Sequence, residues 1–276
     1  MRKIDKDKIF PFPPVSLDSE TTNRLRDEII HEKTYPKKDR KDKKKYDARC
    51  RMDDIKDALK TLYKSKCAYC EQNINDVYYE IEHYRPKAIY YWLAYSWDNL
   101  FISCDKCNRK KLDRFEIKGK RIKSVEPEDL KDIHRLARKY NSIEKPMMIN
   151  PELEDVEDKL TFNWNTGEIE SKDLRCRYTI ECCGLNRKET MENRYTIWKE
   201  FCKKVERVEY DILLLKMKLE KKEINEADYK IKYHDFIVEL KVLIRYFKED
   251  AENTGKAYLG FRQYVVRNHK LFSQGK

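Results

Sequence analysis

The sequence contains no long apolar run and no apolar leader over residues 1–10. These absences predict a chain without a membrane span or a secretory signal, and therefore a cytoplasmic protein in a reducing setting. Structural disulfides are not expected in that setting, although the chain has 9 cysteines. There is also no internal repeat, which argues against a repeat architecture.

Glycine and proline are scarce, at 6 and 8 residues, whereas lysine and arginine together number 61. The formal net charge of +11 favours a polyanionic partner such as nucleic acid. A general bias toward Lys, Ile and Tyr would raise the charge in the same way, so the charge alone is weak evidence. At 276 residues the chain is long enough for one large domain or two small ones.

Four cysteines form two Cys-x-x-Cys pairs, Cys67 with Cys70 and Cys104 with Cys107. Four thiolates at this spacing can supply a tetrahedral zinc site. A redox motif would need only one pair, whereas two pairs that bracket one segment favour a zinc clamp. Because four thiolates leave zinc no open position, the ion would hold structure, and the chemistry would lie between the pairs. The other cysteines lack ligand spacing, and most are expected to be buried: Cys50, Cys176, Cys182, Cys183 and Cys202.

The segment between the cysteine pairs predicts a strand, a loop, a second strand and a short helix. Residues 78–84 are rich in β-forming residues, and Pro86 ends that strand because proline cannot continue a central ladder. Residues 96–100 indicate a turn into the strand 101–103, and a helix is expected to begin near Cys104.

This segment also contains four polar residues that are ordinary when taken singly: Glu82, His83, Asn99 and Asn108. A lone histidine is usually structural, a lone glutamate is usually a surface charge, and the asparagines suit a turn and a helix start. The order Glu-His, Asn, Asn inside a cysteine frame is much less ordinary. It resembles the HNH endonucleases, whose ββα-metal core cuts phosphodiesters with one divalent cation.

The resemblance implies a role for each of these residues. His83 would be the general base that takes a proton from water, and Glu82 and Asn108 would ligate a catalytic Mg²⁺ or Mn²⁺. Asn99 would fix the loop and orient His83. Members of the family often have histidine at the third position, where this chain has Asn108. Both side chains can offer a lone pair to a cation, so this difference affects metal preference more than catalysis.

The sequence around the core is similar to a narrower family, the PtuB proteins of Septu antiphage systems. The specific segments are 81–87, 91–95 and 97–100, and less specific ones are 148–151, 160–162, 167–169, 179–180 and 184–187, with Arg194. The resemblance implies a PtuA-like ATPase as partner. Because such proteins also occur in some retron loci, a retron reverse transcriptase with its RNA/DNA hybrid is a further partner that the resemblance implies.

Basic residues flank the expected site from two directions. They are expected to hold backbone phosphates: Arg85, Lys87, Arg109, Lys110 and Lys111. A dense basic run over residues 37–45 is either an arm that grips phosphates or a solvated loop, and the sequence leaves both open. Nearby aromatics could stack on bases, but packing is the favoured interpretation: Tyr90, Tyr91, Trp92, Tyr95 and Trp97.

Helical spacing of apolar residues predicts a helix over 51–64 and an antiparallel helical hairpin over 197–247. The apolar stripes of the hairpin would form an intramolecular core or, less favoured, a docking face for a partner. The predicted fold is α+β and mostly helical, a zinc-clamped ββα-metal (HNH) core with a C-terminal helical region. We divide it into a basic N-terminal segment (1–50), a zinc-bound nuclease core (51–125) and a mostly helical region (126–276).

The sequence therefore predicts a metal-dependent endonuclease, an effector that cuts nucleic acid and works with an ATPase. DNA is the favoured substrate. The alternatives are an RNA-cleaving effector that acts on a substrate such as tRNA, and a zinc module that binds nucleic acid without catalysis. The last would leave Glu82 and His83 without a role.

Overall fold

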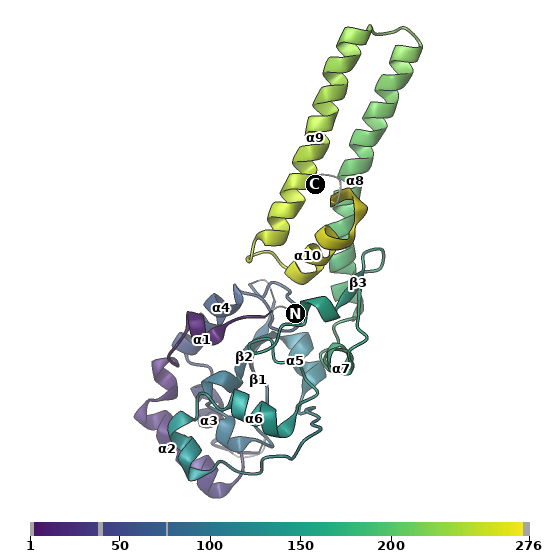
Figure 1. Ribbon diagram of the computed structural model, residues 1–276. Coiled ribbons are helices and arrows are strands. Elements are labelled where there is room, and N and C mark those ends of the chain that lie inside the picture. Colours follow the sequence, from purple (N-terminus) through teal and green to yellow (C-terminus); the bar gives the residue numbers. More distant parts are fainter. Residues whose placement is uncertain (1–2, 38–40, 76, 273–276) are drawn as a thin grey trace. The chain divides into compact units, whose positions relative to one another are not determined.

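The computed structural model describes residues 3–37, 41–75 and 77–272 (Figure 1). The chain divides into two compact units, residues 1–160 with 170–186 and residues 161–169 with 187–276. Neither predicted boundary, after residue 50 or after residue 125, coincides with this division. The N-terminal segment belongs to the unit of the cysteine pairs, since Lys6 Nζ donates to Trp97 O at 2.8 Å and to Leu100 O at 2.9 Å.

Helices dominate both units, so the predicted α+β, mostly helical class is confirmed. The first unit contains α1 (Lys6–Ile9), α2 (Glu20–Glu32), α3 (Lys43–Arg49), α4 (Asp53–Tyr63), β1 (Tyr79–His83), β2 (Leu100–Cys104), α5 (Asp105–Lys111), α6 (Ala137–Glu144) and α7 (Leu174–Cys182). The remaining helices are α8 (Lys188–Glu220), α9 (Glu226–Glu252) and α10 (Leu259–Asn268), and β3 (Thr161–Asn163) pairs with β4 (Glu168–Glu170).

The predicted strand, loop, strand and helix are present as β1, β2 and α5. β1 and β2 pair antiparallel, with Glu82 opposite Phe101 and His83 opposite Leu100. Every residue of β2 is buried, so this strand lies in the core of the unit. α5 follows β2 directly. The last turn of α5 is basic, and these positive charges interact favourably with the negative, C-terminal end of the helix dipole.

The predicted helix over 51–64 is α4, and its buried side chains recur at helical spacing: Ile55, Ala58, Leu59 and Leu62. It ends at Tyr63, because the next residue, Lys64, adopts a left-handed φ of 52° and stops the helix just before the first cysteine pair. The aromatic residues after β1 form core, as favoured. Tyr84 stacks on Phe101 with ring centroids 5.4 Å apart, and the five aromatics between 90 and 97 are all buried.

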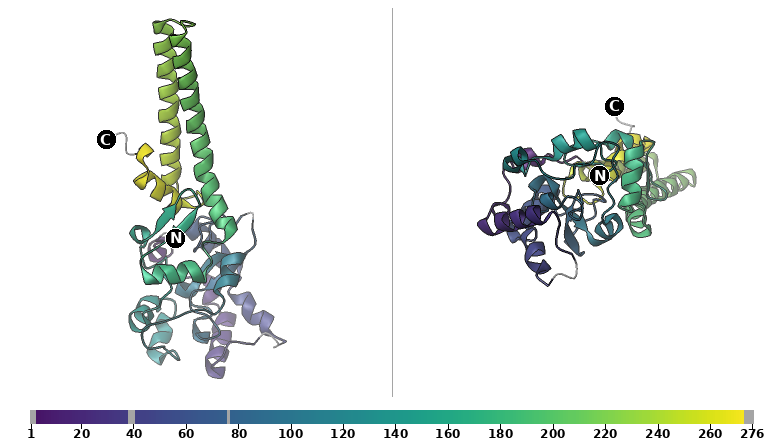
Figure 2. Two further views of the ribbon diagram at one scale, coloured as in Figure 1. Left: turned by 90° about the vertical axis from the view of Figure 1, so that its right-hand side faces the viewer. Right: turned by 90° about the horizontal axis from the view of Figure 1, so that it is seen from below.

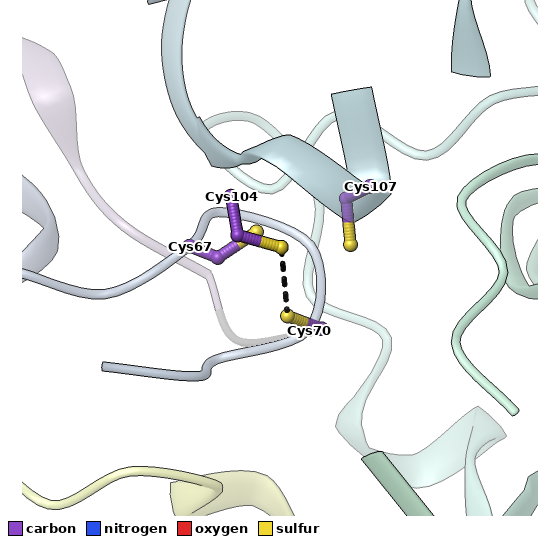
Figure 3. A group of neighbouring side chains, drawn as sticks. All are labelled: Cys67, Cys70, Cys104 and Cys107. Carbon is purple, nitrogen blue, oxygen red and sulfur yellow. Dashed lines mark hydrogen bonds between the residues drawn. The ribbon is translucent and has the colours of Figure 1, made fainter. Parts of the chain in front are cut away.

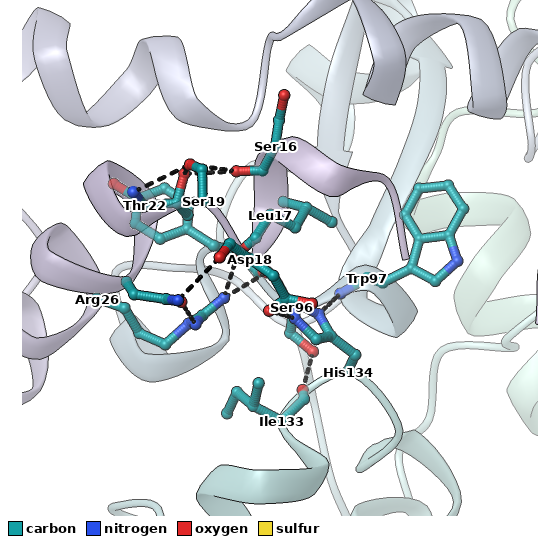
Figure 4. A network of polar contacts seen from close by, with 12 residues as sticks. Ser16, Leu17, Asp18, Ser19, Thr22, Arg26, Ser96, Trp97, Ile133 and His134 are labelled. Atoms are coloured by element: carbon teal, nitrogen blue, oxygen red, sulfur yellow. Dashed lines mark hydrogen bonds and ion pairs between the residues drawn. The ribbon is translucent and has the colours of Figure 1, made fainter. Parts of the chain in front are cut away.

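A polar network joins the N-terminal helices to the segments after β1 and before α6 (Figure 4). The ring of His134 accepts from the backbone N–H of Trp97 through Nδ1 at 3.0 Å. Its Nε2–H therefore donates to Asp18 Oδ1 at 2.9 Å. Arg26 donates to Leu17 O at 2.8 Å and Ser96 Oγ donates to Ile133 O at 2.5 Å. These bonds satisfy buried backbone groups and fix the loop that leads into β2.

The second unit contains the predicted antiparallel hairpin. α8 and α9 run side by side over much of their length (Figures 1 and 2). At its base, the rings of Phe201, Phe247 and Phe272 form a cluster, with centroids 4.7 Å apart for Phe201 and Phe247. Within the described residues, no helix is both long enough and apolar enough to cross a membrane.

Candidate functional site

The four cysteines of the two pairs converge in the structure, as predicted (Figure 3). Cys67 and Cys70 lie in the loop before β1, while Cys104 ends β2 and Cys107 lies in α5. All four are buried, and their sulfur atoms lie within 4.8 Å of one another, with 3.7 Å between Cys70 Sγ and Cys104 Sγ. Thiolates about 2.3 Å from a tetrahedral zinc are separated by about 3.8 Å, so this cluster has the dimensions of a structural zinc site.

The cysteine cluster ties both strands and α5 to the loop before β1. His83 is the last residue of β1, and Asn99 directly precedes β2. Asn108 is in α5, one residue after Cys107, and its side chain is half-buried. The register therefore brings the histidine and the middle asparagine to the same end of the hairpin. Because neighbouring strand residues point to opposite faces, the Glu82 and His83 side chains have different surroundings.

The His83 ring is oriented by a backbone carbonyl. Its Nε2 lies 2.9 Å from Ala94 O, and because a carbonyl only accepts, Nε2 carries the proton and Nδ1 keeps its lone pair. Burial lowers the pKa of His83 to about 3, and the Lys87 and Lys111 ammonium groups act in the same direction. The imidazole is therefore neutral at physiological pH, as a general base must be.

Lys87 lies near His83 and is held by an acidic side chain that the sequence did not single out. Its Nζ is 2.8 Å from Asp47 Oδ1, on α3, and Tyr35 OH donates to the same oxygen at 2.9 Å. Both members of the ion pair are partly exposed. A phosphate that approaches Lys87 would therefore compete with Asp47.

Glu82 faces the first cysteine pair and α5. Its Oε1 is 2.5 Å from Lys111 Nζ, and its Oε2 accepts from Tyr69 OH at 3.0 Å. Lys111 also donates to His83 O at 2.8 Å. Glu82 is 3% exposed and Lys111 is fully buried, so each is the buried counter-ion of the other.

The Glu82 carboxylate is paired with a cation in this structure. A positive group, the Lys111 ammonium, already lies against the carboxylate, and a carboxylate with an amide oxygen is a donor set that suits a hard divalent ion. Glu82 and Asn108 would hold such an ion, which would take the place of the Lys111 ammonium.

Asn99 fixes the loop that contains Ala94. Its Oδ1 accepts from the Arg85 N–H at 2.7 Å, and its Nδ2 donates to Arg85 O and to Leu93 O, both at 3.1 Å. The amide is buried, so these bonds replace bonds to water. Asn99 thereby holds the two ends of the loop at the distance that places Ala94 O against His83.

We expect Asn99→Ala to lower the free energy of unfolding by about 2 kcal/mol or more, because it removes the side-chain partners of the buried N–H and C=O of Arg85 and one of the two bonds to Leu93 O. Urea denaturation of the variant and the wild type would measure this difference. Asn165→Ala, on an exposed turn, is the control and should change the stability little. A variant as stable as the wild type would contradict the role of Asn99 in the loop.

Two of the five basic residues expected to hold phosphates are buried instead. Arg85 is 1% exposed and donates to Glu144 Oε2 at 2.9 Å, and Lys111 pairs with Glu82. The expectation that Arg85 and Lys111 contact nucleic acid does not fit this structure, because both cations are neutralised inside the core. Arg109 and Lys110 are exposed on α5, where Arg109 also pairs with Asp105 at 2.7 Å.

The basic run over 37–45 is described only in part, since residues 38–40 lie outside the described residues. Its last residues begin α3. Lys43 Nζ lies 3.6 Å from Asp47 Oδ2, and Lys45 Nζ lies 3.2 Å from Asp42 Oδ2.

Sequence reasoning missed three groups of the site, which belong to Asp47, Tyr69 and Ala94. Nothing in the spacing signals them, because an acid on another helix and a backbone carbonyl become site groups only through the tertiary structure.

Comparison with known proteins supports the resemblance to HNH endonucleases and to PtuB proteins. Residues 67–114 match the family model of the HNH endonucleases. The chain is 34% identical over 163 residues to Septu protein PtuB of Bacillus mycoides (strain KBAB4), which covers 53% of this chain and 51% of the relative. It is 44% identical over 59 residues to Septu protein PtuB of Bacillus thuringiensis, which covers 21% of this chain and 23% of the relative.

A third relative is Septu protein PtuA of Bacillus mycoides (strain KBAB4), 25% identical over 156 residues, which covers 52% of this chain and 20% of the relative. No solved structure matches the chain. The chain spans about half the length of the first PtuB relative and less than a quarter of the second. The predicted resemblances to HNH endonucleases and to PtuB are confirmed: residues 67–114 match the HNH endonuclease model, within a chain of which about half is similar to Septu protein PtuB.

Proposed function

We propose that this chain is a metal-dependent endonuclease that hydrolyses phosphodiester bonds of nucleic acid, with DNA as the favoured substrate. The observation that carries the proposal is the state of His83, a neutral imidazole whose Nε2–H is held by Ala94 O, so that Nδ1 keeps its lone pair. A zinc module without catalysis would have no use for this arrangement. Its location inside the segment that matches the HNH family supports the same conclusion.

In this proposal His83 Nδ1 takes the proton of the attacking water, while Ala94 O keeps the ring in the required tautomer. Lys87 attracts the phosphate that is cut. A phosphate at Lys87 offsets the ammonium charge that depresses the pKa of His83, and this moves the base toward the range in which proton transfer is efficient. Glu82 and Asn108 would hold the Mg²⁺ or Mn²⁺ ion, whose chemistry is to stabilise negative charge on the phosphate.

The test is incubation of the purified chain with plasmid, linear duplex, single strands and tRNA, each with and without Mg²⁺ or Mn²⁺. Cleavage of DNA that needs the added ion would support the proposal, and cleavage of tRNA alone would favour the RNA-cleaving alternative. Wild-type cutting in a chelator that spares zinc would contradict the single-metal scheme. Binding of all substrates without any cleavage, also in the presence of the partner proposed below, would favour the non-catalytic zinc module.

We also propose that the chain acts with a PtuA-like ATPase in antiphage defence. The similarity to Septu proteins PtuB and PtuA supports this partner, and a retron reverse transcriptase with its RNA/DNA hybrid is the other one that the resemblance implies. The hairpin of α8 and α9 is our candidate for the docking face. Large apolar side chains are exposed along both helices: Tyr210, Leu213, Leu214, Met217, Ile231, Tyr233, Val238 and Tyr246.

We expect Lys216→Glu with Lys218→Glu to weaken assembly with the ATPase encoded beside this chain, because both lysines are exposed among these apolar residues. Size-exclusion chromatography of the co-expressed pair would measure assembly. Lys203→Glu with Lys204→Glu makes the same charge change nearer the start of α8 and is the control. A chain that ignores the ATPase and cuts at full rate alone would favour a free-standing nuclease.

A further inference from the structure

A second basic region of the first unit lies outside the HNH motif. It is a cleft of about 450 Å³ lined by residues of α6 and of the segments beside it: Lys118, Arg138, Asn141, Ser142, Lys145, Pro146, Leu153, Glu154 and Arg175. Four of these residues are cationic and one is acidic. The acid is already neutralised, because Glu154 makes contacts of 2.5 and 2.8 Å with Arg175. The cleft therefore keeps an excess of positive charge.

The backbone brings two of these lysines together. Ile117 and Pro146 form an antiparallel bridge, and Lys118 N–H donates to Lys145 O at 3.1 Å. The approach is close enough to require glycine next to Lys118, since a Cβ on Gly119 would lie 2.0 Å from Ile143 O. Like charges across a bridge are destabilising, yet among the described residues neither lysine has an ion-pair partner.

The remaining cations are arranged differently. Arg138 is exposed and lies 3.8 Å from Asp7, which is a long contact between two exposed groups and holds little energy. Arg175 is anchored, because it donates to Pro146 O at 2.9 Å as well as to Glu154. Among the described residues, the cleft thus presents two lysines without an ion pair and one weakly paired arginine beside the anchored Arg175.

Asn141 connects the cleft to the candidate site. The Arg85 guanidinium donates to Asn141 Oδ1 at 2.7 Å, and the backbone N–H of Arg85 donates to Asn99 Oδ1. Arg85 is two residues beyond His83. The cleft therefore borders the loop that follows the proposed general base.

We propose that this cleft binds the phosphodiester backbone of the nucleic acid beyond the bond that is cut. This inference rests on the proposed function and adds to it a location for the substrate strand. Unpaired lysines supply the sequence-independent contacts that backbones require. A free nucleotide is a poorer fit, because none of the described lining residues has an aromatic ring on which a base could stack.

The test is a binding measurement with the full chain carrying His83→Ala, so that cleavage does not intervene. Fluorescence anisotropy with a labelled duplex and a labelled single strand, from about 50 to about 200 mM salt, gives the affinity and its salt dependence. We expect Lys118→Glu with Lys145→Glu to weaken binding about tenfold or more. Loss of two phosphate contacts should also make the logarithmic salt slope shallower by about 2.

The control is Lys131→Glu with Lys172→Glu, which makes the same change of net charge at two exposed lysines of the same unit outside the cleft. It should weaken binding much less than the cleft variant. Equal effects of the two variants would overturn the proposal, because the charge would then act only globally. Tight binding of ATP that the cleft variant abolishes, with nucleic-acid binding unchanged, would also overturn it and would identify a nucleotide site.

The two proposals can fail separately. If the wild type cuts nucleic acid but the cleft and control variants bind it equally, the cleft proposal fails and the nuclease proposal stands. If no substrate is cut under any condition but the cleft variant selectively loses binding, the nuclease proposal fails and the cleft remains a nucleic-acid site. Circular dichroism of each variant establishes that the fold is intact before binding is compared.

Discussion

Cys67→Ser or Cys107→Ser should abolish zinc binding and unfold the unit that contains His83. Each substitution removes one of four sulfur atoms that converge within 4.8 Å. A structural zinc contributes about 10–16 kcal/mol of apparent binding free energy, which equals or exceeds the whole stability of a typical domain. Elemental analysis should find about one zinc per wild-type chain, and circular dichroism should report the loss of structure in the variants.

Cys182→Ser and Cys183→Ser are the matched controls. Both cysteines are buried but lie outside the cluster. Zinc content should therefore be unchanged in both variants, although each replaces a buried thiol. If the four clustered cysteines prove dispensable for metal content, the zinc clamp is wrong.

His83→Ala is expected to reduce cleavage by about 100-fold or more while fold, zinc content and nucleic-acid binding persist. The variant removes the neutral imidazole that Ala94 O orients at the end of β1, and it leaves the cysteine cluster untouched. Single-turnover cleavage rates measured with saturating protein would separate a loss of chemistry from a loss of binding. Full activity of a folded His83→Ala chain would eliminate the proposed base, and equal plaque counts for cells with either form would argue against a defence role.

The two proposed metal ligands, Glu82 and Asn108, differ in how cleanly their substitution tests the metal requirement of cleavage. Asn108→Ala changes a half-buried side chain and should raise the Mg²⁺ or Mn²⁺ concentration needed for cleavage. Glu82→Ala should do the same, but it also leaves the Lys111 ammonium buried without its counter-ion, which typically costs about 3–5 kcal/mol of stability. Asn108 therefore gives the cleaner measurement.

The sequence by itself determined the parts of this protein that depend on local pattern. Cysteine spacing predicted the cluster, β-forming residues and proline placement predicted β1 and its end, and helical spacing predicted α4 and the hairpin of α8 and α9. These features are readable because ligand spacing and hydrophobic period are set along the chain, within a few residues.

Only the tertiary structure decided which charges face inward. Arg85 and Lys111 look like phosphate contacts in the sequence, but Glu144 and Glu82, distant along the chain, neutralise them in the core. Asp47 and Ala94 reach the His83 region in the same way. A charge is buried only where a partner is brought to it, because an unpaired charge in the interior is too costly. Since the partners come from distant segments, the fold alone assigns each cation to the core or to the surface.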